Sequence, residues 1–484
     1  MRSACGAGRR IRAAGARLTL WPIALLGILA CGAGPSSHPG ADVLLITVDT
    51  LRADRLGLLG YERPTTPGID RFFASGRMYE RAYSTAASTS PSVVSILTGL
   101  LPAEHRVRLL YQLVPADVRL VTDYLPPEYR KAAFVSNVVL TDQATGIAAR
   151  FDHYDDFVDE PESARRVYER GARRNTDAAL HWLAEGGAGA RPLFLWIHYI
   201  DPHGPYRAPP EWPRSFRSDE PRPLEPRRVI PYMREPGVTD GGAYVAAYDE
   251  EIAWLDSQIA RLLEGYAALR PIDQALVVFT ADHGESMMEH EKWFRHGHQV
   301  YEEVMRVPLL LRGPGVAPGR SDRLAQGTDV APTILRFVGV EPPPAMPDVD
   351  LRTGRGLGRD RLLPVEATYQ TEQWRGVIGD GRKWMMHLVG RDRAVKQARS
   401  YDLARDPQEL QPGPLAGRER GARLLEELRL ADPDPSGVSE TLRRGRAPSA
   451  PGLAPGVAPD VAPDVLERLK ALGYAGQEEE GPEP

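Results

Sequence analysis

Cysteine is nearly absent from this sequence, because Cys5 and Cys31 are the only two among 484 residues. Cys5 lies in an arginine-rich start that is typical of a removable targeting segment, and Cys31 lies at its end. The processed chain would therefore contain no pair of thiols. We exclude both a fold stapled by disulfides and catalysis by a thiol.

Long hydrophobic runs are missing as well. The apolar run Leu18–Ala30 contains Pro22 and is too short for a comfortable membrane span. Residues 1–31 hold five arginines and no acid, and the last four, I-L-A-C, resemble a bacterial lipoprotein box. We predict a signal peptide over 1–31, a lipid anchor to the membrane at Cys31 and a linker over 32–40. The protein is then exported to the bacterial cell envelope, either periplasmic or anchored as a lipoprotein; the alternative is plain signal cleavage with Cys31 incidental.

Basic residues are fewer than acidic ones. The formal net charge is −5, and without residues 1–31 the chain has 55 basic against 65 acidic residues, a net charge of −10. An acidic surface repels the phosphates of nucleic acids, so nucleic acid is excluded as the natural partner. The sequence also shows no internal repeat.

The sequence does contain a series of apolar runs separated by helical patterns. The run Ala41–Val48 is typical of a strand buried on both faces. The other runs are Lys131–Val135, Leu193–Ile197, Leu276–Thr280 and Val307–Leu311, and the helical patterns are Asn175–Glu185 and Tyr244–Leu269. Strands alternating with helices predict an α/β fold in which helices sandwich a large, mostly parallel sheet.

The alternation lapses near Pro342, which sets the expected domain boundaries. Residues 41–345 should form the domain that carries the site, and 346–415 a small C-terminal α+β subdomain with short strands. Residues 416–484 are rich in proline and glycine, so we predict a largely flexible tail with one short helix, Val465–Leu472.

Residues with catalytic or metal-binding chemistry follow several of the apolar runs. They are Asp49, Thr50, His198, Asp201, His203, Asp282 and His283. Sites in open α/β sheets form beyond the carboxyl ends of the strands. The common placement of these residues predicts one site at one edge of the sheet.

A further candidate lies in the stretch Ser88–Gly99. Ser90 can cap a helix and Pro91 suits its first position, which places Thr89 just before a helix N-terminus. Free N–H groups there favour an anion, so the Thr89 hydroxyl could be a nucleophile towards a negatively charged ester. The alternative is a surface turn with a capping hydroxyl.

Several motifs occur together in one order along the chain. They are V-D-T-L-R-A-D from Val48, T-S-P-S…L-T-G from Thr89, H-Y-I-D-P-H-G-P-Y from His198, T-A-D-H-G-E from Thr280, Y-E-E-V-M-R-V-P-L-L-L-R-G-P-G from Tyr301, D-V-A-P-T-I-L from Asp329 and Y-D-L-A-R-D-P from Tyr401. With these motifs the sequence resembles the sulfatase family of the alkaline phosphatase superfamily over about residues 41–410. The resemblance implies a metal-dependent ester hydrolase with a small antiparallel sheet in a C-terminal subdomain.

The resemblance also implies a metal site. Asp49, Asp282 and His283 match the family's ligand positions, and Thr89 matches the nucleophile, which also reaches the metal. Carboxylate oxygens suit Ca²⁺, Mg²⁺ or Mn²⁺, whereas the histidine keeps Zn²⁺ possible. The metal would stabilise the Thr89 alkoxide and neutralise an ester oxygen.

Three histidines are the candidates for contacting the ester. His203 matches a position within reach of the ester, as a donor to it or to the leaving group. His296 and His298 lie near the position at which the family often has a lysine that contacts the sulfate. We expect these three side chains to act in catalysis.

The sequence departs from the family at positions that matter for chemistry. Sulfatases usually have Cys or Ser at the nucleophile position, oxidised to formylglycine, whereas Thr89 cannot give that aldehyde and no formylglycine is expected. Val93 replaces the helper arginine and Thr50 replaces the second acid of the first motif. In the stretch that usually has a lysine and a histidine, Asn137 is the polar substitute; we assign Asn137 and Asp201 to substrate binding.

The departures leave three hypotheses open. The first is a hydrolase of sulfuric or phosphoric esters, small or borne on a glycan or lipid, in which a phosphoester fits Thr89 better than a sulfate ester does. The second is a phospho-transferase that forms a Thr89 adduct. The third is a catalytically degraded binding protein of the envelope. A second metal held by Asp201, His203 and either His296 or His298 is a further possibility.

Overall fold

The computed structural model describes residues 36–165, 167–218, 221–369, 372–379, 381–390, 393–415 and 419–431. The predicted signal peptide and lipid anchor, residues 32–35 of the linker and the helix Val465–Leu472 lie outside these residues. The described helices include none that combines the length and apolar character needed to span a bilayer.

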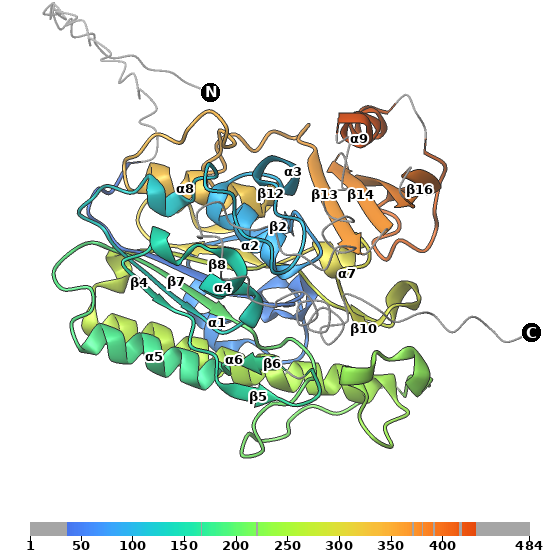
Figure 1. Cartoon of the computed structure of the whole chain (residues 1–484), viewed down its shortest axis with the longest axis horizontal. Coiled ribbons are helices and arrows are strands. Elements are labelled where there is room, and N and C mark those ends of the chain that lie inside the picture. Colours follow the sequence, from blue (N-terminus) through green and yellow to red (C-terminus); the bar gives the residue numbers. More distant parts are fainter. Residues whose placement is uncertain are drawn as a thin grey trace, which may run out of the picture. The chain divides into compact units, whose positions relative to one another are not determined.

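An eight-stranded sheet forms the centre of the described chain (Figure 1), in the order β12-β2-β11-β8-β1-β7-β3-β4. Its strands are β1 (Val43–Val48), β2 (Arg77–Tyr83), β3 (Arg130–Val135), β4 (His153–Asp155), β7 (Leu193–Tyr199), β8 (Leu276–Ala281), β11 (Leu309–Arg312) and β12 (Gly319–Gln326). All pairings are parallel except the two made by β11. This mostly parallel sheet confirms the predicted fold class.

Helices cover both faces of the sheet because alternate side chains of each buried strand point to opposite faces. Leu44, Ile46 and Val48 of β1 belong to one apolar cluster, with α1, α5 and α6, whereas Val43 and Leu45 belong to another, with α2 and α8. Figure 1 shows α5 and α6 below the sheet and α8 above it. The helices are α1 (Pro67–Phe73), α2 (Thr89–Thr98), α3 (Pro102–His105), α4 (Asp142–Thr145), α5 (Ala172–Ala184), α6 (Gly241–Leu269), α7 (Glu302–Met305) and α8 (Val330–Phe337).

Two strand pairs lie outside the large sheet in the same part of the chain. β5 (Glu160–Glu162) pairs with β6 (Val167–Glu169), and β9 (Ser286–Met287) pairs with β10 (Trp293–Arg295), both antiparallel. Each pair forms a short hairpin: β5–β6 follows β4 and β9–β10 follows β8.

A four-stranded antiparallel sheet follows in the order β13-β14-β15-β16. Its strands are β13 (Leu363–Tyr369), β14 (Glu372–Gly379), β15 (Arg382–Val389) and β16 (Ala394–Asp402). The helix α9 (Arg420–Ala431) packs on it, with Ala422 and Leu425 in one apolar cluster with Trp384. The sequence analysis ended this subdomain at residue 415, whereas α9 continues the packed structure beyond that point.

A buried ion-pair cluster joins the small sheet to the main domain. The Nζ of Lys383, on β15, lies 2.9 Å from Glu302 Oε1 at the start of α7 and 2.9 Å from Glu409 Oε1. Lys383 is fully buried. Because removing one member of such a cluster leaves another buried charge uncompensated, the cluster fixes how the two parts pack.

Candidate active site

The candidate site lies at the carboxyl edge of the central strands. Asp49 follows β1 and Asp282 follows β8, and the pairing of Val48 with Ala281 places these two aspartates level with each other. On the other side of β1, the neighbouring strand β7 contributes His198. The parallel register therefore brings together side chains that are far apart in the sequence.

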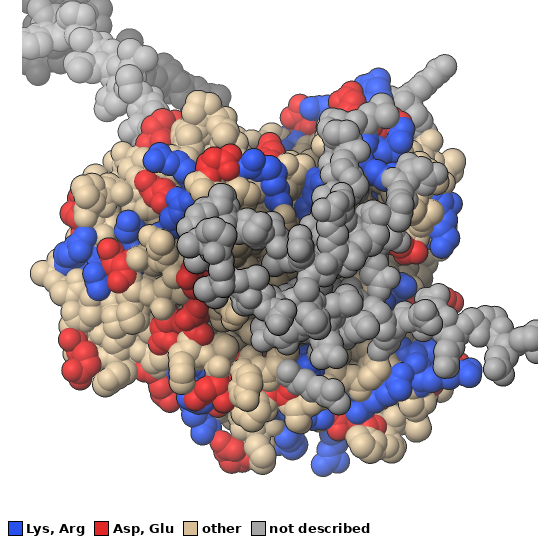
Figure 2. All heavy atoms as spheres, viewed as in Figure 1, with Lys and Arg blue, Asp and Glu red and all other residues tan. Residues whose placement is uncertain are grey.

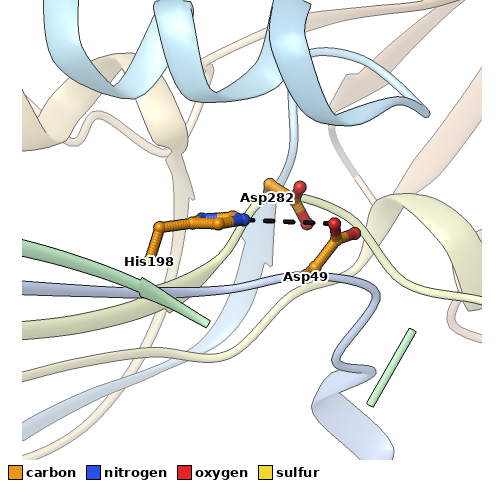
Figure 3. Close-up of side chains that lie close together, drawn as sticks. All are labelled: Asp49, His198 and Asp282. Carbon is orange, nitrogen blue, oxygen red and sulfur yellow. Dashed lines mark ion pairs between the residues drawn. The ribbon is translucent and has the colours of Figure 1, made fainter. Parts of the chain in front are cut away.

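Asp49, His198 and Asp282 form a compact, buried group (Figure 3). One ligand atom of each residue lies within 4.8 Å of the others, and all three side chains are fully buried. His198 Nε2 is 4.0 Å from Asp49 Oδ2. Figure 3 shows the imidazole and both carboxylates pointing toward one another beneath the helix α2.

The donor set fits a metal ion. Asp49 Oδ1, Asp282 Oδ2 and His198 Nε2 are buried and have no hydrogen-bond partner within the described parts of the chain. Burial, and then the charge of Asp282, raises the pKa of Asp49 well above its usual value. Burial raises the pKa of Asp282 to about 8. Two buried carboxylates with spare oxygens are costly unless a cation neutralises them.

His283 lies against the same group. Its backbone N–H donates to Asp282 Oδ1 at 2.6 Å, and its Nδ1 contacts Gly284 O at 2.9 Å. Its Nε2 is 3.7 Å from Asp49 Oδ1 and 3.7 Å from Asp282 Oδ2. Burial, and then the neighbouring His296, lowers the pKa of His283 to about 4. Because Nδ1 donates to the Gly284 carbonyl, the neutral ring presents the Nε2 lone pair to this group.

Thr89 is the first residue of α2. Its Oγ1 lies 3.4 Å from Asp49 Oδ2 and 3.5 Å from His283 Nε2. The helix begins two residues earlier than expected, and the hydroxyl of Ser90 donates to Val139 O instead of capping it. The helix N-terminus therefore points its dipole toward the position of Thr89 itself.

Asn137 also reaches this group. Its Nδ2 donates to Asp49 Oδ2 at 2.5 Å, and its Oδ1 accepts from the backbone N–H of Val139 at 3.1 Å. This second contact fixes which way the amide faces. Asn137 follows β3, whose Val135 pairs with His198, so a fourth neighbouring strand contributes to the same edge.

Two more predicted histidines lie beside His283 and the group of Asp49, His198 and Asp282. The ring centroids of His283 and His296 are 4.5 Å apart, and those of His296 and His203 are 5.0 Å apart. His203 Nδ1 contacts Gly204 O at 2.8 Å, and His296 Nδ1 contacts Glu285 Oε1 at 3.2 Å. Burial lowers the pKa of both rings, that of His296 to about 3. Each is therefore neutral in the free protein.

Two predicted site residues have their described contacts outside the group of Asp49, His198 and Asp282. The ring of His298 packs on Tyr369 of the small sheet, with centroids 3.8 Å apart. Asp201 lines a cavity together with Glu169 and Glu251. Within the described residues, no cluster at metal-ligand distance combines Asp201, His203 and His296 or His298, so nothing in the geometry favours the second metal.

A model of the Sulfatase family matches residues 41–340, which is more than half of the chain. The chain belongs to the Sulfatase family. Human iduronate 2-sulfatase is 23% identical over 411 residues, covering 64% of this chain and 71% of its own. The choline-sulfatase of Rhizobium meliloti is 26% identical over 328 residues, covering 63% of this chain and 60% of its own.

Solved structures show the same fold. The phosphonate monoester hydrolase of Agrobacterium radiobacter matches with a TM-score of 0.62 and 18% identity, covering 81% of this chain and 95% of its own. A putative sulfatase from Bacteroides thetaiotaomicron matches with a TM-score of 0.63 and 20% identity, covering 85% and 96%. The predicted family and alkaline phosphatase-like fold are confirmed, and the protein is a sulfatase-like hydrolase.

This sulfatase-family protein has a strained residue directly after Asp49. Thr50 has φ of 54°, a left-handed conformation that a β-branched residue rarely adopts. Its N–H donates to Asp282 Oδ1 at 3.2 Å, and its carbonyl accepts from Tyr248 OH at 2.7 Å. The strained backbone thus supplies an N–H to the second aspartate of the group, at the position where the family resemblance led us to expect an acid.

The sequence predicts His198 at the edge that carries the site, without a specific role, and gives no indication of Arg165. His198 is part of the group shown in Figure 3, and its place at the end of an apolar run was the available signal. Arg165 lies in the turn between β5 and β6 and is buried. Burial and then the charge of Arg165 lower the pKa of His203 and His296, and the same charge opposes the burial that raises the pKa of Asp49. This turn shows no periodicity, so no pattern could have indicated that Arg165 reaches the site.

Proposed function

We propose that this sulfatase-family protein hydrolyses phosphoric, phosphonic or sulfuric esters, with Thr89 as the nucleophile and a divalent cation in the site. The observation that carries the proposal is the position of Thr89 Oγ1, within 3.5 Å of both Asp49 and His283 and beside carboxylate oxygens that lack partners. A mere capping hydroxyl would not need two buried acids and a histidine around it.

Asp49, Asp282 and His283 would hold the cation, and His198 would be a further ligand. Two carboxylates suit Ca²⁺, Mg²⁺ or Mn²⁺, and the imidazoles also suit Zn²⁺. Bound there, the cation would supply positive charge that favours the alkoxide of Thr89 and neutralises an ester oxygen.

Thr89, His203 and water account for the bonds and protons that change in the reaction. Thr89 Oγ1 forms a bond to phosphorus or sulfur as its proton leaves to water, and the bond to the alcohol breaks. His203, which packs on His296 beside His283, would donate a proton to the departing alcohol oxygen once an anionic substrate raises the ring's affinity for protons. Water then breaks the Thr89 ester, and Thr89 regains its proton.

Phosphorus is favoured over sulfur by the residues around Thr89. Threonine cannot form the aldehyde of the usual sulfatases, and the buried Val93 stands where the family has an arginine. A threonine on phosphorus needs only metal activation. The similarity to a phosphonate monoester hydrolase and to sulfatases, one of them solved with D-glucosamine-2-N,6-O-disulfate, supports an ester that is small or borne on a glycan or a lipid.

Turnover of model esters tests this proposal. Protein purified with residues 32–484 is assayed with aryl phosphate, aryl phosphonate, bis-aryl phosphodiester and aryl sulfate in the presence of each metal. We expect phosphorus esters to be hydrolysed and Thr89→Ala to lower kcat by about 10³-fold or more, as loss of a nucleophile does. Thr98→Ala, at the other end of α2, is the matched control and should lower kcat less than about twofold.

Unchanged turnover in Thr89→Ala would refute the nucleophile. Turnover of aryl sulfate alone, dependent on Thr89, would reverse the preference for phosphorus. A stoichiometric Thr89 adduct that reaches an added alcohol faster than water would favour the transferase. Metal binding without turnover of any ester would favour the binding protein.

A further inference from the structure

A polar cavity is lined in part by Asp201, which precedes His203 by two residues. It has a volume of about 510 Å³ and is bordered by the β5–β6 hairpin, the segment after β7 and the helix α6. The residues used below are Glu162, Glu169, Asp201, Arg207, Glu251 and Trp254, all of which line it. Figure 2 shows acidic and basic side chains intermixed on the lower part of the molecule, where Figure 1 places β5 and α6.

Two carboxylates of this cavity have spare oxygens. Asp201 is 8% exposed and Glu251 is 6% exposed. Asp201 Oδ2 and Glu251 Oε2 have no hydrogen-bond partner among the residues that the structure describes, and neither residue has an ion pair with a described residue within 4 Å. Buried carboxylate oxygens without donors are rare in proteins, because each loses its hydration and gains nothing in return.

The other acids of the cavity are already paired. Glu162 lies near Arg165 and Arg207, at 3.4 Å and 3.8 Å, and Glu169 pairs with Arg165. Glu211 pairs with Arg173 at 2.8 Å, and Glu160 with Arg174 at 3.4 Å. Within the described residues Asp201 and Glu251 have no such ion pair; the backbone N–H groups of Ala172 and Arg207 serve Asp201 and Glu251, and one oxygen of each carboxylate is left over.

Burial and neighbouring negative charges act on both carboxyl groups. Burial and then the charge of Asp201 raise the pKa of Glu251 well above its usual value, and burial and then the charge of Glu169 raise the pKa of Asp201 to about 7. A bound cation would relieve both the burial cost and the repulsion.

We propose that this cavity binds an organic ammonium group, carried by the alcohol part of the ester that the protein hydrolyses. Two spare oxygens suit the N–H donors of an amine, whereas the cavity offers no third ligand at metal-binding distance within the described chain. Trp254 and the prolines Pro205 and Pro209 give the cavity apolar walls for the carbon atoms next to the nitrogen.

The position of the cavity links it to the ester. Asp201 precedes His203 by two residues, and Arg165, which pairs with the cavity's Glu162 and Glu169, acts electrostatically on Asp49. One substrate could therefore place its ester at Thr89 and its amine at Glu251. The identity of the substrate as an amino-alcohol ester rests on the proposed function; the ammonium site itself does not.

Calorimetric titration of the full chain tests the site directly. The probes are ethanolamine and tetramethylammonium, with ethylene glycol as the uncharged analogue and Ca²⁺ as the metal alternative. We expect ethanolamine to bind at pH 8 at least tenfold more tightly than ethylene glycol. Glu251→Gln should weaken ethanolamine at least tenfold, because it removes the charge of a buried ionic contact.

Glu250→Gln is the matched control, because Glu250 is the neighbouring buried acid of α6 and does not line the cavity. It should leave ethanolamine affinity within twofold. Thermal unfolding of both variants shows whether they fold. If Glu251→Gln fails to fold, Asp201→Asn replaces it with the same expected loss.

Failure of the inference is distinguishable from failure of the proposed function. Absence of ethanolamine binding, binding of Ca²⁺ alone, or equal losses in Glu251→Gln and Glu250→Gln would each overturn the ammonium site, whatever the ester turnover. Ammonium binding without turnover of any ester would uphold the site and refute the hydrolase. With both upheld, O-phosphoethanolamine should have a KM at least tenfold below that of ethyl phosphate, and Glu251→Gln should abolish the difference.

Discussion

Asp49 contacts three parts of the molecule through one carboxylate. Asn137 donates to its Oδ2, Thr89 lies near the same oxygen, and its Oδ1 faces His283. Only one of these contacts, that of Asn137, is a short hydrogen bond from a fixed donor. The carboxylate is therefore oriented by protein and left with an oxygen for a cation.

At this scale the sequence predicted part of the site. Asp49, Asp282, His283 and Asn137 lie together because they follow sheet strands that are readable as apolar runs, and Thr89 joins them as the first residue of α2. His298 and Asp201 match the same logic but lie elsewhere, because a residue's place in a loop does not determine the direction of its side chain. His298 packs on Tyr369, and Asp201 lines a cavity with Glu251. No local sequence pattern connects either pair.

His105 provides a test of a single buried ring away from the site. Its Nδ1 accepts from Val107 N–H at 3.1 Å and its Nε2 lies 3.0 Å from Ser95 Oγ, so it is held neutral. Burial lowers its pKa to about 3, from 6.5. Between these values the unfolded chain binds a proton that the folded chain does not, so acidification below pH 6.5 favours unfolding through this residue.

We therefore expect the free energy of unfolding of His105→Gln to fall less steeply on acidification than that of the wild type. From pH 6 to pH 4 the free energy of unfolding of the wild type should fall by about 1.4 kcal/mol per pH unit more than that of the variant. Urea unfolding at several pH values gives the free energy of unfolding of both proteins. Subtracting the variant from the wild type at each pH removes the contribution of the other titrating groups. Parallel pH profiles for the two proteins would contradict the assignment.

At the scale of elements, sequence patterns predicted the buried strands better than the peripheral ones. β1, β3, β7 and β8 read as apolar runs because both of their faces are covered. β2 (R-M-Y-E-R-A-Y) and β12 (G-R-S-D-R-L-A-Q) contain charged residues at the side of the sheet where solvent reaches them. The antiparallel direction of β11 could not be predicted, since an apolar run carries no sign of its direction.

The helix α9 was missed for a related reason. Its sequence follows a polar stretch rich in glycine and proline, and only its packed face is apolar. Leu425 is fully buried against the small sheet, in the cluster of Val377, Trp384, Met386 and Leu388. The cluster, rather than helix propensity, holds the helix in place.

Leu425→Ala should therefore release α9. We expect a loss of about 2–5 kcal/mol from this cluster, as for other buried leucines, and faster tryptic cleavage at the arginines of 420–429. Arg423→Ala, on the exposed side of the same helix, should change stability by less than about 0.5 kcal/mol. Urea unfolding and limited proteolysis report the two effects; equal protease resistance in wild type and Leu425→Ala would contradict the packing role of α9.

At the scale of the whole molecule, the site is a junction of segments far apart in the chain. β1, α2, the end of β3, β7 and the end of β8 all contribute side chains. A cation bound only by the folded arrangement stabilises the entire fold, by about 2.7 kcal/mol at one hundred times its Kd. Because 1 kcal/mol shifts Tm by about 2–4 °C in a domain of this size, the ion should raise Tm by roughly 5–10 °C.

Chelation should therefore lower Tm reversibly, and scanning calorimetry with and without EDTA measures it. Asp282→Asn should abolish the metal-dependent shift while raising Tm of the metal-free protein, because it removes one of two repelling buried carboxylates. Asp273→Asn, at an exposed position before β8, is the control and should keep the shift. An undiminished shift in Asp282→Asn would exclude the proposed ligand set.

The buried Lys383 makes the main domain depend on the small C-terminal sheet. Its ammonium group, contributed by the small sheet, compensates a glutamate of the main domain, Glu302. A chain cut near residue 345 would lose this ion pair and would uncover Val300, Val304 and Met305, which share one apolar cluster with the small sheet, so no minimal catalyst should be obtainable by trimming. Exchanging C-terminal modules among relatives would succeed only where the donor module brings along a cation at this position.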